Sequence, residues 1–210
     1  MSWWEERVLP RITDKALGVA HIAGFRARVC AGLRGEVVEI GFGSGLNVPH
    51  YPSGVTGVAA VEPSDLAWRL AQRRVATAKV PVRRVGLDGQ RLPLPDSSYD
   101  SALSTFTMCT VPDLDAALRE LARVLAPGGS LHFLEHGLAP DAGVVRWQHR
   151  LQPIQGRVAG GCHLGRPILD ALTRNGFEVA EVDTFYAGRP RAFTYLYLGR
   201  ASARHAAGSV

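Results

Sequence analysis

Residues 37–45 read Val37-Val38-Glu39-Ile40-Gly41-Phe42-Gly43-Ser44-Gly45, and this stretch decides the fold. A short apolar run of this kind suits a buried strand. The glycines after it permit a tight turn and leave bare backbone amides for a ligand at the start of a helix. A dinucleotide-binding fingerprint would need glycine in place of Leu46 or Val48, depending on which glycine begins the motif, so that ligand class does not fit.

Acidic residues around this loop indicate what kind of ligand it holds. Glu39 beside the glycines would repel a pyrophosphate, but it suits a ligand that carries a sulfonium and an ammonium group. Glu62, at the end of the second expected strand, is placed to accept hydrogen bonds from both hydroxyls of a ribose. Asp88, just past the third expected strand, is placed to meet an adenine amino group, with an ordinary turn aspartate in the Asp88-Gly89 pair as the alternative.

Downstream of the loop, short apolar runs suited to buried strands alternate with stretches of helical periodicity. The expected strands cover residues 37–40, 57–61, 82–85, 99–104 and 130–134. The expected helices cover residues 65–78 and 113–126, the second followed by the stop signal Pro127-Gly128-Gly129. Alternation of this kind predicts a parallel, doubly wound sheet with helices on both faces.

The last third of the sequence departs from this alternation. Residues 146–174 show helical spacing with a break at Gly160-Gly161. Two strand-like runs, 177–185 and 192–198, follow with only a short turn between them, so they must pair antiparallel. The predicted fold is therefore α/β: a Rossmann-like, doubly wound, mostly parallel seven-stranded sheet that ends in an antiparallel hairpin.

The chain of 210 residues is long enough for one domain with a full core. Apolar residues recur at helical spacing upstream of the glycine loop, so we expect a helical cap over residues 1–34 that forms a lid on the ligand cleft. The domain itself is expected over residues 35–200. Residues 201–210 are small and polar, and we expect them to form a disordered tail.

Composition limits the compartment and the partners. The start has no basic region followed by an apolar one, no apolar run is long enough to span a bilayer, and the three cysteines are widely spaced. We therefore expect a cytoplasmic protein with reduced thiols and no transmembrane segment. The net charge of +5 comes from scattered arginines, which does not favour nucleic acid, while peripheral contact with a membrane surface stays open. Cys162-His163 has no second pair of ligands at suitable spacing, so no metal is expected.

Several motifs make the sequence resemble a known family. Those shared with class I methyltransferases are Glu39 to Gly45, Glu62-Pro63-Ser64, Leu92 to Asp100 and Leu121 to Gly129. The sequence is also similar to the bacterial branch of the thiol S-methyltransferase (methyltransferase-like seven) family at Thr107 to Val111, Phe133 to His136 and Gly161 to Arg166. The resemblance implies S-adenosylmethionine as cofactor, held by Glu39, Gly41, Phe42, Gly43, Ser44, Gly45, Asn47, Glu62, Pro63, Ser64, Asp88, Gly89, Thr105 and Phe106.

Residues that could act on the methyl acceptor lie near the carboxyl ends of the expected strands, where open α/β sheets bind ligands. A thiol acceptor, with a pKa of about 8.5, must lose its proton, and His136 is our first choice for the base. A loop histidine bonded to backbone is the alternative for His136. Cys109 and His163 are the other catalytic candidates, although Cys109 also fits a small apolar pocket residue.

The resemblance favours a small, largely apolar thiol as the acceptor, and hence S-methylation as the reaction. A phospholipid amine and a quinone carbon are the alternative acceptors. A protein that binds S-adenosylmethionine without turnover is the alternative function. The sequence is compatible with a monomer and with a homodimer.

Overall fold

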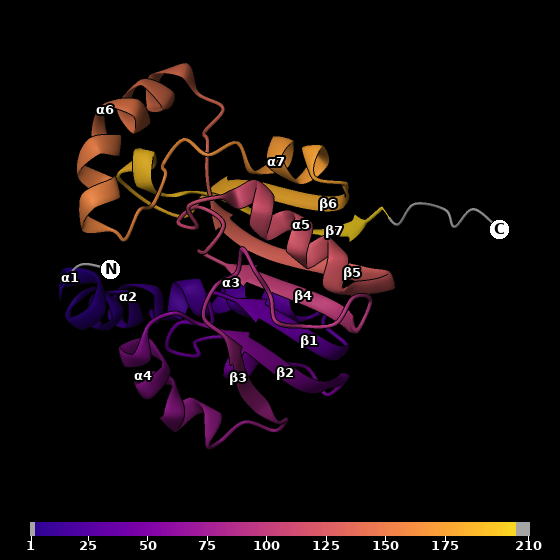
Figure 1. Ribbon diagram of the computed structural model, residues 1–210. Helices are drawn as coiled ribbons and strands as arrows, with labels where there is room; N and C mark the ends of the chain where they lie inside the picture. Colours follow the sequence, from indigo (N-terminus) through magenta and orange to yellow (C-terminus); the bar gives the residue numbers. More distant parts are fainter. Residues whose placement is uncertain (1–2, 205–210) are drawn as a thin grey trace.

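The computed structural model describes residues 3–204. Its first part consists of three helices, α1 (Trp3–Arg7), α2 (Leu9–Leu17) and α3 (Ala20–Cys30), in the region where the sequence predicts a helical cap. Figure 1 shows α1 and α2 at one end of the molecule and α3 running along the sheet. Pro10 lies in the first turn of α2, where its missing N–H costs no hydrogen bond.

A seven-stranded sheet forms the centre of the molecule (Figure 1). Its strands are β1 (Gly35–Ile40), β2 (Val55–Val61), β3 (Val82–Gly86), β4 (Tyr99–Thr105), β5 (Leu125–His136), β6 (Phe177–Tyr186) and β7 (Tyr195–Ala203). They are ordered β3-β2-β1-β4-β5-β7-β6. The first five are parallel, and β7 pairs antiparallel with both β5 and β6. This arrangement confirms the predicted fold class.

The order of the strands reverses between β1 and β4, since the chain moves outward from β1 in one direction and then returns to add β4 on its other side. Ligands of open α/β sheets bind at such a switch point, beyond the carboxyl ends of the strands. The glycine loop after β1 and the segment after β4 are therefore brought together at this position.

The connecting helices are α4 (Asp65–Val75), α5 (Leu114–Val124), α6 (Ala142–Val158) and α7 (Ile168–Arg174), and two short 3-10 helices cover Val48–His50 and Arg191–Phe193. Side chains cap two of the α-helices. Ser64 accepts a hydrogen bond from the Ala67 amide at the start of α4, and Asp113 accepts one from the Ala116 amide at the start of α5. Such caps satisfy amides that have no partner within the helix.

Alternate side chains of the strands enter two cores, one on each face of the sheet. On one face, Val38 and Phe133 belong to a cluster with side chains of α5 and α7, among them Leu118, Leu121, Ile168 and Leu172. On the other face, Val37 and Leu134 pack with residues of α3 and α4, among them Val29, Cys30 and Ala71. Burial on both faces explains the continuous apolar runs of the parallel strands.

Several boundaries differ from the sequence-based expectation. The expected strand 192–198 begins as a 3-10 helix, and β7 starts only at Tyr195 and continues to Ala203. The expected end of the domain at residue 200 is thus too early, because the small residues that follow pair with β5 and β6 and so belong to the sheet. Residues 205–210 of the expected tail lie outside the described chain. Helix α5 ends two residues earlier than expected, and the stop signal at 127–129 forms part of β5.

Candidate active site

The glycine loop after β1 has the conformation that its sequence demands. Gly41, Gly43 and Gly45 have φ angles of +65°, +58° and +73°, a region that side chains disfavour. A Cβ atom on Gly41 would lie 1.9 Å from Oγ1 of Thr107, whereas one on Gly43 would meet nothing closer than 3.8 Å. Gly41 is therefore required for packing against the segment after β4, and Gly43 leaves open space for a ligand.

Glu62, at the end of β2, is bound directly to this loop. Its carboxylate accepts hydrogen bonds from the Gly43 amide at 2.6 Å and from the Ser64 amide at 2.7 Å. Burial raises the pKa of the Glu62 carboxyl, while the two amides and nearby Arg84 oppose that rise. Pro63 links Glu62 to the capping Ser64, so the turn into α4 fixes the carboxylate at the switch point. Each oxygen keeps a lone pair that can accept from a ligand hydroxyl.

Glu39, Asn47 and Thr105 form a buried polar network with Arg26 of α3. Glu39 accepts hydrogen bonds from Nδ2 of Asn47 at 2.9 Å and from the hydroxyl of Tyr51 at 2.5 Å. Arg26 Nη1 donates to Oδ1 of Asn47 at 2.8 Å and to Oγ1 of Thr105 at 2.9 Å. Burial raises the pKa of the Glu39 carboxyl to about 7, and Arg26 is among the groups that oppose this rise.

Arg26 has one further feature. Its side chain is buried, and its Nε atom has no hydrogen-bond partner among the residues described. An unpaired buried donor is costly, which suggests that a polar ligand atom completes it. Its guanidinium also lies 5.4 Å from the centre of the Phe106 ring.

The helical cap contacts the glycine loop through Asp14 of α2. Oδ1 of Asp14 accepts hydrogen bonds from the Ser44 hydroxyl at 2.7 Å and from Nη1 of Arg74 at 2.9 Å. The same Arg74 nitrogen donates to the Ser44 carbonyl at 2.9 Å. Asp14 thus ties α2, the loop and α4 together above the switch point.

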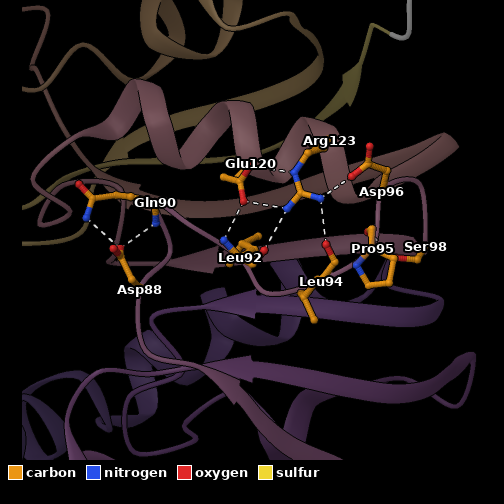
Figure 2. A network of polar contacts seen from close by, with 9 residues as sticks. All are labelled: Asp88, Gln90, Leu92, Leu94, Pro95, Asp96, Ser98, Glu120 and Arg123. Carbon is orange, nitrogen blue, oxygen red and sulfur yellow. Dashed lines mark hydrogen bonds and ion pairs between the residues drawn. The ribbon is translucent and has the colours of Figure 1, made fainter.

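Asp88 and Gly89 follow β3. Oδ1 of Asp88 accepts hydrogen bonds from the backbone N–H and from Nε2 of Gln90, at 2.9 and 2.8 Å (Figure 2). The Asp88 side chain is exposed and makes the turn interaction that the sequence offers as one interpretation. A Cβ atom on Gly89 would lie 3.5 Å from Ile40, so this turn packs beside the end of β1.

Arg123 of α5 holds the proline-rich segment that follows this turn (Figure 2). Its Nη2 donates to the Leu92 carbonyl at 3.0 Å, and its Nη1 donates to the Leu94 carbonyl at 2.9 Å and to Asp96 at 2.5 Å. Nε and Nη2 bind the carboxylate of Glu120, both at 2.8 Å, and that carboxylate accepts from the Leu92 amide at 2.7 Å. All five guanidinium N–H groups are used.

Strain marks the segment after β4. Phe106 has a φ of +55°, which is unfavourable for a residue with a Cβ, and such strain is concentrated at functional sites. Glu135 of β5 fixes the segment by accepting from the Ser104 hydroxyl at 2.7 Å, the Thr107 amide at 3.0 Å and the Cys109 amide at 3.4 Å. Burial raises the pKa of the Glu135 carboxyl to about 7.

His136 follows Glu135 at the end of β5. Its side chain is only 5% exposed, and neither ring nitrogen has a hydrogen-bond partner within the described chain. The interpretation as a loop histidine bonded to backbone is therefore wrong for the ring. One nitrogen can face the Cys162 thiol, which leaves the other free to contact a ligand, because an unpaired buried nitrogen is unfavourable.

The thiols of Cys109 and Cys162 lie beside His136. A hydrogen bond from Cys109 and the neighbouring His136 lower the pKa of Cys162 to about 5, and the same bond raises the pKa of Cys109. The His163 amide donates to the Cys109 carbonyl at 2.8 Å, which holds the two segments together. The His163 side chain, by contrast, is exposed, and its Nδ1 lies 3.2 Å from Nη2 of Arg166.

Sequence reasoning missed Arg26 and the participation of Cys162. Arg26 lies on the same face of α3 as the buried Val29 and Cys30, three and four residues later, and a basic residue on an apolar face is a signal for a buried partner. No sequence signal pairs Cys162 with Cys109. No group of three or more potential ligand side chains within residues 3–204 could hold a metal ion. Within the same residues, no helix is long and apolar enough to cross a membrane.

The domain family described as "Methyltransferase domain" matches residues 38–133. The thiol S-methyltransferase TMT1B of Rattus norvegicus is 30% identical over 78% of this chain and 66% of its own length, and human TMT1A is 32% identical over 68% and 60%. The chain thus spans somewhat less than two thirds of these relatives. Shorter matches reach a phosphatidylethanolamine N-methyltransferase of Cereibacter sphaeroides, 28% identical over 110 residues, and a ubiquinone/menaquinone C-methyltransferase of Caulobacter, 54% identical over 48 residues.

Solved structures share the fold. A S-adenosylmethionine-dependent methyltransferase of Thermotoga maritima superposes with a TM-score of 0.69 at 24% identity, covering 97% of this chain and 100% of its own. A chain of the complex of the Haloferax volcanii Trm112 methyltransferase activator superposes with a TM-score of 0.72 at 19% identity, covering 96% of both chains. Fold, loop and matched domain together define a class I S-adenosylmethionine-dependent methyltransferase domain.

Within that class, the chain is related to the thiol S-methyltransferase family. The relationship agrees with the motifs after β4, at the end of β5 and around Cys162.

Proposed function

We propose that the protein transfers the methyl group of S-adenosylmethionine to the sulfur of a small, largely apolar thiol. The observation that carries the proposal is His136, which is buried at the carboxyl end of β5 beside the Cys162 thiol and has no backbone or side-chain partner at hydrogen-bond geometry among the residues described. The relatives with thiol S-methyltransferase activity supply the acceptor class. The Cys162 thiol lies beside this histidine, and it is hydrogen-bonded to Cys109 of the segment that begins at the strained Phe106.

The residues of the glycine loop fit the cofactor. Gly43 leaves open space beside Glu62, whose remaining lone pairs suit the hydroxyls of a ribose. Glu39 and Arg26, which are joined through Asn47, suit the ammonium and carboxylate groups of an amino acid, with the unpaired Nε of Arg26 as a donor for the latter. Asp88 reaches an adenine amino group once its side chain leaves Gln90.

Bound S-adenosylmethionine supplies a methyl group on a sulfonium, and the electrons of the broken carbon–sulfur bond remain on what becomes a neutral thioether. His136 accepts the proton of the acceptor thiol, so that a lone pair of the thiolate can form the new bond to the methyl carbon. The chain otherwise aligns the reactants: the cap and α4 enclose the loop through Asp14, and Glu135 fixes the segment that faces the acceptor.

Measurement of S-adenosylhomocysteine formation with an alkyl thiol, phosphatidylethanolamine vesicles and a quinol tests the proposal. The thiol should be methylated, and His136→Ala should lose about 10²–10⁴-fold of turnover on it, the usual contribution of a general base. The loss should shrink for thiols acidic enough to ionise unaided. His149→Ala, a change at an exposed histidine of α6, is the control and should retain activity.

Methylation of only the amine or the quinol would overturn the choice of a thiol. Full activity of His136→Ala on a weakly acidic thiol would overturn the role of the histidine while leaving the acceptor class intact.

A further inference from the structure

Helix α6 carries an unusual combination of side chains on its outer surface. Trp147, Ile154 and Val158 are 55%, 63% and 48% exposed, although all three are large and apolar. They are spaced seven and four residues apart, so they lie within about 40° of one another around the helix axis. They lie along one side of the helix, which also contains Pro153, and we call them the α6 stripe.

Three arginines flank the α6 stripe on one side. Arg146, Arg150 and Arg157 are exposed, and at about 100° per residue they lie roughly 60–100° from the stripe. The guanidinium of Arg150 stands over the ring of Trp147 at 5.5 Å. Helix α6 contains no aspartate or glutamate. An apolar stripe beside a purely basic flank is the pattern of helices that lie in a membrane interface.

The orientation of this helix is fixed from its inner side. Gln148 is buried, accepts from the Ala139 amide at 3.1 Å and donates to the Gly137 carbonyl at 3.0 Å. One turn later, Gln152 accepts from the Leu164 amide at 2.7 Å and donates to the Cys162 carbonyl at 3.0 Å. These four hydrogen bonds hold the inner face against the catalytic segments, so the stripe cannot turn inward to be buried.

The exposed apolar surface continues beyond the end of the helix. Nε1 of Trp4 donates to the Val158 carbonyl at 3.0 Å, and the adjacent Trp3 is 69% exposed. Figure 1 places α6 and α1 at the same end of the molecule, beyond the carboxyl ends of the parallel strands. Since α1 also carries Glu5 and Glu6, the basic contact belongs to α6, with Trp3 as a further apolar group.

We propose that α6 docks the protein on an anionic phospholipid surface, with the stripe in the headgroup region and its arginines on lipid phosphates. The three arginines and the lack of any acidic residue in α6 complement an anionic surface rather than a neutral apolar groove. Symmetric pairing of two copies through this face would bring the same arginines together, which is unfavourable. Docking would set the acceptor side of the site against the membrane, where apolar acceptors concentrate.

Vesicle sedimentation tests the proposal with the full chain. We compare vesicles of phosphatidylcholine alone with vesicles of roughly three parts phosphatidylcholine to one part phosphatidylglycerol, whose surface potential attracts basic residues. The protein should bind the anionic vesicles, and more weakly at high salt. Changing Arg146, Arg150 and Arg157 together to Glu should lower the partition coefficient at least about tenfold, since each basic residue near such a surface contributes roughly fivefold.

Two further variants separate docking from nonspecific attraction. Trp147→Ser with Ile154→Ser should lower binding to anionic vesicles about tenfold with the charges intact. The control changes Arg73, Lys79 and Arg83, which are exposed around α4 and β3, to Glu, and should retain most of the binding. S-adenosylhomocysteine affinity and circular dichroism show that each variant is folded.

Equal losses in the control and the α6 variants would overturn the proposal, because net charge alone would then explain binding. Absence of binding to both vesicle types would overturn it as well. So would a dimer seen by sedimentation velocity that the α6 substitutions abolish, since the stripe would then serve a second copy of the chain. None of these results depends on the identity of the methyl acceptor.

Discussion

Arg123 offers a direct test of how the segment after β3 is held, because one side chain satisfies several backbone groups at once. Arg123→Ala removes hydrogen bonds to the carbonyls of Leu92 and Leu94 and the ion pairs with Glu120 and Asp96. We expect the variant to fold but to be clearly less stable than the wild type.

The magnitude follows from the exposure of each partner. The two partly buried carbonyls lose charge-assisted bonds and contribute about 1 kcal/mol each after allowance for water that replaces the guanidinium. The pair with Glu120, whose side chains are 30% and 21% exposed, adds about 0.5–1 kcal/mol, and the pair with the 74% exposed Asp96 adds almost nothing. The free energy of unfolding should thus fall by about 2.5–3 kcal/mol, which lowers Tm by about 5–10 °C in a chain of this size.

Thermal and urea unfolding followed by circular dichroism measure this loss. Arg119→Ala is the matched control, because Arg119 lies on the same helix, is exposed and makes one 3.4 Å hydrogen bond to Asn175; its Tm should change by less than about 2 °C. Arg123→Lys should remain close to Arg123→Ala, since one ammonium group cannot reach carbonyls and carboxylates in a fork. A Tm of Arg123→Ala within about 2 °C of the Arg119→Ala value would refute the reasoning.

Three further predictions concern the glycine loop and its acids. Burial raises the pKa of Glu39 from 4.5 to about 7, so the folded state retains a proton that the unfolded state releases, and stability is lost as pH rises from about 4.5 through about 7. Glu39→Gln should reduce that slope of unfolding free energy by up to about 1.4 kcal/mol per pH unit, and identical slopes in urea titrations would contradict the assignment. Glu62→Ala should lower S-adenosylhomocysteine affinity at least about tenfold by calorimetry and should also lower Tm without ligand, because the amides of Gly43 and Ser64 lose their acceptor; unchanged affinity would reject the ribose role. Gly41→Ala should lower both Tm and S-adenosylhomocysteine affinity, because its Cβ would clash with the segment after β4. Gly43→Ala should mainly lower that affinity. Equal Tm losses in the two variants would show that space for the ligand is not what distinguishes the two positions.

Much of the fold could be predicted because its signals are local. The buried parallel strands are rich in Val, Ala, Ile and Leu. The glycines of the loop indicate where β1 ends, because the turn there needs positive φ angles. The boundary of β7 could not be predicted, since residues 201–203 join the sheet only through partners on two other strands. Tertiary pairing overrides a weak local preference there.

The candidate site was predictable to a similar extent and for the same reason. Glu39 and Glu62 follow apolar runs at the switch point, so their positions are set by strand ends. Arg26 reaches Thr105 across most of the first half of the chain, and Cys162 meets Cys109 from a loop beyond α6. Contacts of such sequence separation leave no periodicity to detect.

The position of Arg26 makes the first three helices and the sheet inseparable. Arg26 belongs to a segment that precedes β1, yet its guanidinium joins Asn47 in donating a hydrogen bond to Thr105 at the end of β4. A fragment that began at Gly35 would retain every strand and would expose the apolar residues beneath α3, while Glu39 and Asn47 would lose their cationic neighbour. Such a fragment should therefore collapse into a state without a defined ligand pocket. Exchange of the first helices between relatives should succeed only when the transferred helices carry a residue that can bind Asn47 and Thr105 as Arg26 does.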